Sequence, residues 1–181
     1  MTTHAPHAID LVIDFVNTLD IEAGTDELAT PDDLARWFAA KGLLGAGAHK
    51  PSADDRDAAI RLREALRALM LEQNGGPRDE RSARELEHAA RRGDLGVAFA
   101  ADGSVLLRPG HDDLAGALAA VLVPVAHGAS DGSWLRAKAC RASDCQWAFY
   151  DRSRNRSGTW CDMAVCGNRT KVRAYRQRAP G

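Results

Sequence analysis

All four cysteines of this 181-residue chain lie within its last 42 residues. Their spacing is Cys140-x4-Cys145-x15-Cys161-x4-Cys166, and no histidine occurs after residue 134. Two short cysteine pairs separated by a longer loop can bring four thiolates to one point, as a tetrahedral zinc ion requires. A closed four-thiolate site leaves no coordination position for water, so we expect a structural zinc ion rather than a catalytic one. An iron centre or two disulfides are the alternatives.

The first residues bear on the choice between metal and disulfides. Residues 1–14 contain no basic segment and no uninterrupted apolar run, because Asp10 and Asp14 interrupt it, so they do not resemble a secretion signal. We therefore expect a cytoplasmic protein, where reducing conditions favour thiolate–metal bonds over disulfides. No apolar run reaches about eighteen residues, and the sequence predicts no membrane-spanning helix and no membrane partner.

Charge divides the chain into an acidic body and a basic module. Residues 1–133 carry a net charge of -9, whereas residues 134–181 carry +8 and six of the ten aromatic residues. A segment of this size buries too little apolar surface to fold comfortably alone, so a bound metal would have to stabilise it. We predict two domains, residues 1–132 and 133–181, separated by a small polar linker at residues 128–132, and unfolding of the second domain on chelation.

Helix caps and turn residues indicate the architecture of the body. A Ser, Thr or Asp N-cap followed by acidic residues typically opens a helix, and an Asp-Gly turn between apolar runs predicts a hairpin. The expected elements are helices over about 31–41, 53–73, 78–92 and 114–126, with a kink or early end at Pro124, and strands over 95–100 and 104–108. Residues 9–20 fit neither a period of 2 nor one of 3.6 and are left unassigned. The predicted fold class is α+β, a mixed helical domain with a β-hairpin or small sheet.

The body contains no strong catalytic motif. Phosphate-binding glycine loops, a nucleophile elbow and a zinc-protease motif are missing from the sequence, and three histidines are isolated in it, which favours a protein that is not an enzyme. One polar cluster is set among apolar residues, namely Asp14, Asn17 and Thr18. These side chains could line a pocket for a small-molecule effector, or they could hold a turn by bonding to the backbone.

The basic module has the order of elements of a treble-clef zinc finger. A strand over residues 134–139 would lead into a knuckle around Cys140 and Cys145. Residues 146–150 and 157–160 would form the arms of a hairpin, with residues 151–156 at its turn. A helix would then run from about residue 163 or 166 to residue 177.

Arginines of this module suit contact with nucleic-acid phosphates. Arg169, Arg173 and Arg176 fall on one stripe of the expected helix, with Val172 and Tyr175 on a neighbouring stripe that could pack on the hairpin. A guanidinium group donates two parallel hydrogen bonds to a phosphate, so the pattern predicts a nucleic-acid surface. The candidate residues are Arg152, Arg154, Arg156, Arg169, Lys171, Arg173 and Arg176.

The same arginines allow a second interpretation. A four-thiolate zinc site carries a net charge of -2, and Arg169, three residues after Cys166, could neutralise the sulfurs. Other arginines could dock on the acidic body of the same chain or of a second copy. Subtracting these leaves about three to five phosphate contacts, which predicts a log–log salt slope of about -3 to -5 for binding of duplex DNA.

The segment Cys161-Asp-Met-Ala-Val-Cys166-Gly-Asn-Arg169, preceded by Trp147-Ala-Phe-Tyr-Asp-Arg-Ser-Arg-Asn155, resembles the CGNR zinc-finger family. Asp14-Phe-Val-Asn-Thr18 resembles the opening motif of the ABATE domain, the usual N-terminal partner of that finger. The resemblance implies a bacterial stress-induced transcription regulator, with an α+β ABATE domain that senses a ligand and a treble-clef finger that binds DNA. Family members often carry two arginines before the Trp-Cys pair, where this chain has Gly158 and Thr159. That difference should weaken phosphate contact or shift it toward Arg152–Arg156.

The sequence thus predicts a one-component regulator whose body senses a small molecule or mediates dimerisation and whose finger contacts the DNA backbone. One short helix reaches few base edges, so sequence discrimination would require a homodimer. Two rival hypotheses remain. The finger could dock on an acidic protein without binding DNA, or the body could be a small enzyme with a pocket near Asp14, Asn17 and Thr18.

Overall fold

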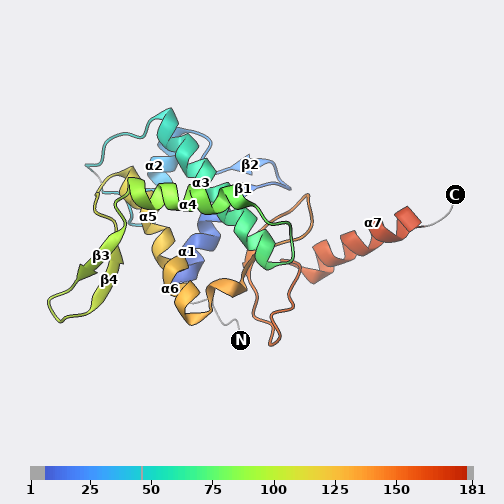
Figure 1. Ribbon diagram of the computed structural model, residues 1–181. Helices are drawn as coiled ribbons and strands as arrows, with labels where there is room; N and C mark the ends of the chain where they lie inside the picture. The colour runs from blue at the N-terminus through green and yellow to red at the C-terminus, as the bar shows by residue number, and fades with distance from the viewer. Residues whose placement is uncertain (1–6, 46, 179–181) are drawn as a thin grey trace.

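The computed structural model describes residues 7–45 and 47–178. Helices predominate, and three separate two-stranded antiparallel sheets accompany them (Figure 1). In chain order the elements are α1 (His7–Val16), β1 (Leu19–Asp20), β2 (Thr25–Asp26), α2 (Pro31–Ala40), α3 (Ala53–Gln73), α4 (Glu80–Arg92), β3 (Gly96–Phe99), β4 (Val105–Arg108), α5 (Leu114–Ala120), α6 (Leu122–Asp131), the 3-10 helix η1 (Trp134–Arg136), β5 (Ala137–Ala139), β6 (Ala148–Tyr150), the π-helical turn η2 (Met163–Gly167) and α7 (Asn168–Arg178). The predicted α+β class is confirmed.

Helices α2 and α3 begin where their capping signals place them. Thr30 and Asp33 form a reciprocal capping box at the start of α2, and Ser52 and Asp55 form another at the start of α3. Each box satisfies backbone N–H groups that have no partner within the helix, which is why these short polar motifs predict a helix start accurately. Gly42 follows α2 with a φ of +69°, a left-handed conformation that a side chain would disfavour.

The main core lies where α1, α2, α3, α5 and α6 meet. Phe15, Trp37 and Phe38 form an aromatic cluster in it, with ring centroids 5.0 to 5.8 Å apart. The unassigned N-terminal segment is the amphipathic helix α1, whose Ile9, Val12, Phe15 and Val16 are almost completely buried. Ten residues that include two aspartates give too little periodic signal to identify this helix in the sequence.

The α5–α6 segment differs from its sequence-based expectation. Helix α5 ends at Ala120, four residues before Pro124, because a proline cannot bond to the carbonyl at that position and its ring clashes with it. The residues expected to form a linker, 128–131, are the end of α6, and Gly128 is buried there. By length and composition alone, the segment Leu114–Asp131 could cross a membrane, with a mean hydropathy of 1.4, although the sequence predicts no spanning helix. Half of it is buried inside the protein, as in a core helix.

The core continues from the body into the cysteine-rich module. Ala137, Ala139 and Ala148 of the β5–β6 hairpin are buried in the same cluster as the body helices, and β5 packs along α3. The four cysteines form a second, smaller cluster with Ala142 and Trp160. The β5–β6 hairpin therefore shares its core with the helices of the body.

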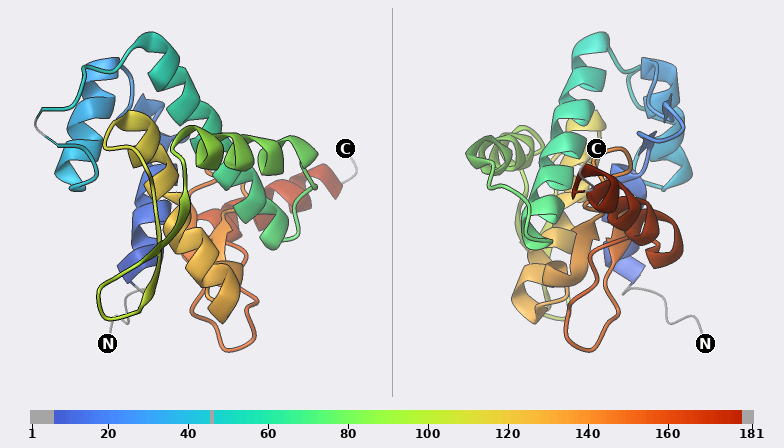
Figure 2. Two further views of the ribbon diagram at one scale, coloured as in Figure 1. Left: turned by 60° about the vertical axis from the view of Figure 1, so that its left-hand side comes forward. Right: turned by 90° about the vertical axis from the view of Figure 1, so that its right-hand side faces the viewer.

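Two elements project from this core in opposite directions (Figure 1). The β3–β4 hairpin, predicted from its Asp-Gly turn, leaves Val97, Phe99 and Val105 well exposed, Phe99 to 75%. Helix α7 extends from the other side of the molecule. The loop between β6 and η2 reaches past the end of α6 in both views of Figure 2.

Candidate metal centre and nucleic-acid interface

The structure brings all four cysteine thiols together. Their sulfur atoms lie within 4.8 Å of one another, and Cys161 Sγ is 3.6 Å from Cys145 Sγ and 3.7 Å from Cys166 Sγ. A tetrahedral zinc ion with Zn–S bonds of about 2.3 Å holds its sulfurs about 3.8 Å apart, whereas a disulfide requires about 2.05 Å. The four thiols are free, so the donor set fits zinc and excludes the disulfide alternative.

Two tight turns aim the thiols at one point. Cys140 directly follows β5, and the backbone N–H of Cys145 donates to Ala142 O at 2.9 Å to close the first turn. In the second turn, the Asp162 carboxylate accepts from the backbone N–H groups of Ala164 and Val165 at 2.7 and 3.0 Å. The N–H of Cys166 also donates to Asp162 O at 2.9 Å. The knuckle and the following helix of the predicted finger are confirmed.

The pKa values of the cysteine thiols are shifted in different directions. Burial raises the pKa of Cys145 to about 11 and raises that of Cys161 further. Burial also acts on Cys140, but backbone hydrogen bonds from Cys161 and Ala142 outweigh it and lower the pKa of that thiol. Four thiolates in this buried position need a cation, which a divalent metal supplies.

The predicted hairpin between the cysteine pairs is not formed in the described residues. Strand β6 pairs with β5 instead, in the register Ala137↔Tyr150, so the hairpin encloses the knuckle. Residues 151–160 form an irregular loop, which we call the arginine loop because Arg152, Arg154 and Arg156 are exposed on it. From the sequence alone, strand 146–150 could be paired either with residues 157–160 or with the strand before Cys140.

A buried ion pair holds the arginine loop in place. Lys138 Nζ donates to Asp151 Oδ2 at 2.7 Å, and the two side chains are only 6% and 2% exposed. Lys138 also donates to the carbonyls of Arg156 at 2.6 Å and Gly158 at 3.0 Å. Asp151 accepts from the backbone N–H groups of Ser153 at 2.9 Å and Gly158 at 2.8 Å. These bonds join both ends of the loop, and the pKa of Asp151 falls to about 2 although burial acts to raise it, because Lys138, Ser153 and Gly158 stabilise the carboxylate.

The arginines of the stripe predicted on α7 have different partners in the structure. Arg169 donates to both carboxylate oxygens of Glu22, at 2.6 and 3.2 Å, and to Cys166 Sγ at 3.5 Å. Arg173 donates to Asp144 at 2.9 Å. Arg169 and Arg173 therefore neutralise nearby carboxylates and a sulfur, whereas Lys171 and Arg176 are exposed.

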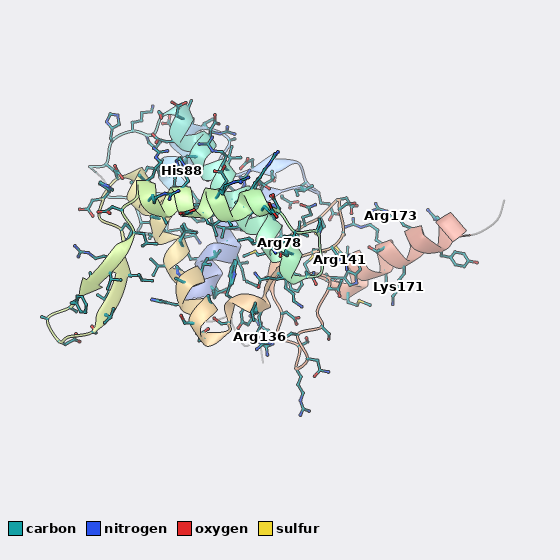
Figure 3. All side chains as sticks on the ribbon, viewed as in Figure 1. Arg78, His88, Arg136, Arg141, Lys171 and Arg173 are labelled. Atoms are coloured by element: carbon teal, nitrogen blue, oxygen red, sulfur yellow. The ribbon has the colours of Figure 1, made fainter. Side chains whose placement is uncertain are left out.

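Lys171 and Arg173 lie on opposite sides of α7 in Figure 3. Val172 and Tyr175 do not pack on a hairpin as expected, since they are 48% and 76% exposed. Arg141, which sequence analysis left out, adds an exposed cation in the knuckle. Its position beside Cys140 was the only signal for it in the sequence.

The Asp14, Asn17 and Thr18 cluster is bonded to the protein itself. Asn17 Nδ2 donates to Ala148 O at 3.0 Å, and its Oδ1 accepts from Ala148 N at 2.7 Å. Thr18 is buried and donates to Phe15 O, whereas Asp14 forms an exposed ion pair with Lys41 at 2.6 Å. The three side chains face different surroundings: Thr18 holds the turn after α1, whereas Asn17 joins this turn to β6, 131 residues later.

These features define a class of protein: an acidic α+β domain joined to a basic zinc finger with four cysteine thiols. Family models match both parts, one described as "Putative stress-induced transcription regulator" (ABATE) over residues 10–131 and one described as CGNR zinc finger over residues 136–179. The chain belongs to the ABATE family and carries a C-terminal CGNR zinc finger. The resemblance inferred from its motifs is confirmed, and its implied cofactor is zinc. A search of curated proteins finds no match.

Proposed function

We propose that this protein is a cytoplasmic DNA-binding transcription regulator without enzymatic activity. The zinc ion is held by Cys140, Cys145, Cys161 and Cys166 and has a structural role. The DNA backbone contacts the arginine loop and the exposed cations of α7. The observation that carries the proposal is the buried Lys138–Asp151 pair, since it fixes a loop whose three arginines are all exposed.

The number of available cations agrees with the expected binding. Arg152, Arg154 and Arg156 of the loop and Lys171 and Arg176 of α7 remain exposed after Arg169 and Arg173 have been assigned to carboxylates. Each phosphate contact contributes about -0.9 to the slope of log affinity against log salt concentration. Three to five bound phosphates therefore correspond to a slope of about -3 to -5.

The test is a salt titration of DNA binding by fluorescence anisotropy. Replacement of Arg152, Arg154 and Arg156 by alanine should make the slope less steep by about 0.9 for each phosphate that the variant no longer binds. A matched control replaces Arg81, Arg84 and Arg91, three exposed arginines of α4, and removes the same charge from the body. Equal effects of the two triple substitutions, or no binding of the wild-type protein at low salt, would refute the proposal.

The ABATE domain has a surface suited to homodimerisation. Val97, Phe99 and Val105 lie on one face of the β3–β4 hairpin, because Val97 pairs with Leu107 and Phe99 with Val105. An exposed apolar face with no charged side chain can pack against its own copy, and a dimer would provide the two finger modules that sequence discrimination requires. The ABATE domain also has a surface hollow in which a small polar effector could bind. Its volume is about 350 Å³, and it is lined by Asp26, Glu27, Asp33, Arg36, Trp37 and Ala40.

Exposed apolar residues favour one alternative function. Met163 and Val165 of η2 and Val172 and Tyr175 of α7 are each at least 48% exposed among the basic residues. Such a surface could bind an acidic protein instead of DNA. Under this alternative, Tyr175→Ala and Val172→Ala should abolish capture of the partner, whereas the purified protein should show no affinity for duplex DNA even at low salt.

A further inference from the structure

The ABATE domain contacts the backbone beside each half of the zinc site. On the last turns of α3, Arg67 Nη1 donates to Gln146 O at 2.8 Å, and Gln146 directly follows Cys145. Asn74 Nδ2 donates to Ala139 O and to Thr159 O, both at 2.8 Å. Ala139 directly precedes Cys140, and Thr159 lies two residues before Cys161. A single helix of the body thus fixes three of the segments that carry thiols.

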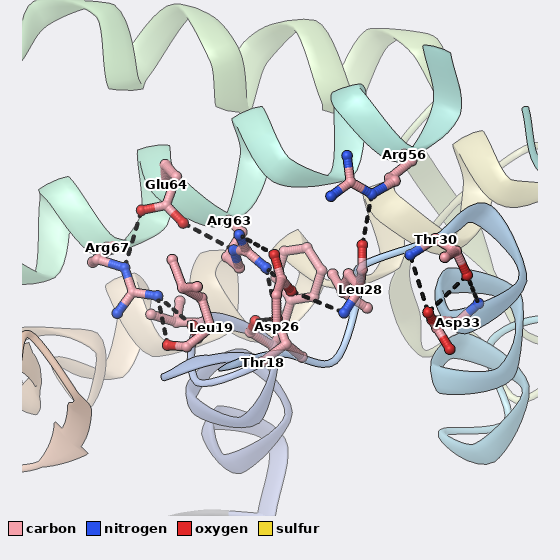
Figure 4. A network of polar contacts seen from close by, with 12 residues as sticks. Thr18, Leu19, Asp26, Leu28, Thr30, Asp33, Arg56, Arg63, Glu64 and Arg67 are labelled. Carbon is pink, nitrogen blue, oxygen red and sulfur yellow. Dashed lines mark hydrogen bonds and ion pairs between the residues drawn. The ribbon is translucent and has the colours of Figure 1, made fainter. Parts of the chain in front are cut away.

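Arg67 of α3 and Asn74, the residue that caps its C-terminus, are both built into the interior of the protein. Arg67 is 2% exposed, and its guanidinium group also donates to Val16 O at 2.7 Å and to Glu64 at 3.1 Å. Figure 4 shows Arg67 reaching from α3 toward the loop after α1. Asn74 is 8% exposed. Breaking a hydrogen bond at such a buried position is costly, because no water molecule is available to donate to the carbonyl in place of the lost donor.

The segment after Cys145 needs such an anchor. Gln146 has a φ of +51°, a left-handed conformation that is uncommon for a residue with a side chain. Arg67 bonds to the carbonyl of this residue, and Asn17 bonds to both backbone groups of Ala148 two residues later. The fourth cysteine is contacted through Arg169, which joins Cys166 Sγ to Glu22 of the body.

We propose that Arg67 and Asn74 are positioning residues of the zinc centre. They hold the thiol-bearing segments in the geometry that the metal requires before it binds, so the ABATE domain sets the zinc affinity of the finger. Coupling between two ligands is reciprocal. If a molecule that binds the ABATE domain changes the zinc affinity of the finger through α3, zinc must change the affinity of the protein for that molecule by the same factor.

The test compares zinc affinities of full-length variants by competition with a chromophoric chelator. Asn74→Asp keeps the shape of the side chain but replaces the donor with a carboxylate, and Arg67→Met removes the guanidinium group. Loss of groups that orient metal ligands weakens metal affinity by about 10- to 100-fold, and we expect losses in this range. Cobalt titrations should show a weaker thiolate-to-metal charge-transfer band for both variants, a readout that a change in stability alone does not produce.

Arg63→Met is the matched control. Arg63 is 2% exposed on the same helix, one turn from Arg67, but its partners Thr18, Asp26 and Glu64 all belong to the body. This variant should melt at a lower temperature while its zinc affinity below the transition stays within about threefold of wild type. Measurements are made on samples that circular dichroism shows to be folded, and Asn74→Asp decides the outcome if Arg67→Met does not fold. The proposal is overturned if Asn74→Asp binds zinc within twofold of wild type, or if Arg63→Met loses as much affinity as Asn74→Asp.

Discussion

Asp151→Asn removes one charge of the buried pair that holds the arginine loop. The native pKa of Asp151 is about 2, against 3.8 for the ordinary carboxyl group. At about 1.4 kcal/mol for each pH unit between these two pKa values, ionisation of Asp151 contributes about 2 to 3 kcal/mol to stability at neutral pH. Removing one partner of a buried pair typically costs about 3–5 kcal/mol, because the other charge stays buried. We therefore expect a loss of about 2 to 4 kcal/mol in the free energy of unfolding.

The pH dependence has a definite sign. Because folding lowers the pKa of Asp151, its contribution is fully present above pH 4 and is lost as the pH falls through about 2. The difference between wild type and Asp151→Asn should therefore shrink between pH 4 and pH 2. Metal release in acid also removes support from the arginine loop, so the metal content of both proteins is measured at each pH.

The assay is urea denaturation of zinc-loaded protein at pH 7, repeated at intervals down to pH 2. Glu87→Gln provides the control, because it breaks the exposed pair with Arg91 and should cost no more than about 0.5 kcal/mol. Trypsin should also cleave the arginine loop faster in Asp151→Asn, since the loop loses the bonds that join its ends. A loss below about 0.5 kcal/mol at pH 7, or an unchanged difference in acid, would refute this explanation of how the loop is held.

Chelation should increase hydrogen exchange at β5, at β6 and at residues 67–74 of α3, because Arg67 and Asn74 bond to the metal-bearing segments; exchange confined to the finger would contradict this. Glu22→Gln should free Arg169 to contact a phosphate and make the salt slope of DNA binding steeper by about 0.9. An unchanged slope would show that Arg169 does not contact DNA even without its carboxylate partner. Phe99→Asp should shift the protein toward the monomer in sedimentation experiments, with Ser130→Asp on the exposed end of α6 as a control that adds the same charge, and an unchanged oligomeric state in Phe99→Asp would exclude the hairpin as the interface.

Local signals in the sequence predicted local structure. The capping boxes at Thr30 and Ser52 and the turn at Asp102-Gly103 were sufficient because each motif satisfies or shapes its own backbone. The cysteine spacing predicted the metal site for the same reason, since each pair closes a short turn. Helix α1 was missed because ten residues with two aspartates give too little periodic signal.

Contacts between distant segments could not be predicted from the sequence. Nothing local indicates that Asn74 bonds to Thr159, or that Glu22 pairs with Arg169, 147 residues later. The strand pairing failed for the same reason, because the short segments 146–150 and 157–160 do not specify a partner. A lysine between two alanines at position 138 was the one signal of the buried pair, since a charge on a buried strand needs a counter-ion.

The most direct test of the proposed function is the salt dependence of duplex DNA binding, measured with zinc-loaded protein and with the same protein after removal of the metal. The zinc-loaded protein should bind with a log–log slope of about -3 to -5, and the metal-free protein should lose most of this affinity as the arginine loop and α7 lose their support. Equal affinity and slope with and without zinc would contradict the claim that the metal centre positions the DNA-binding surface.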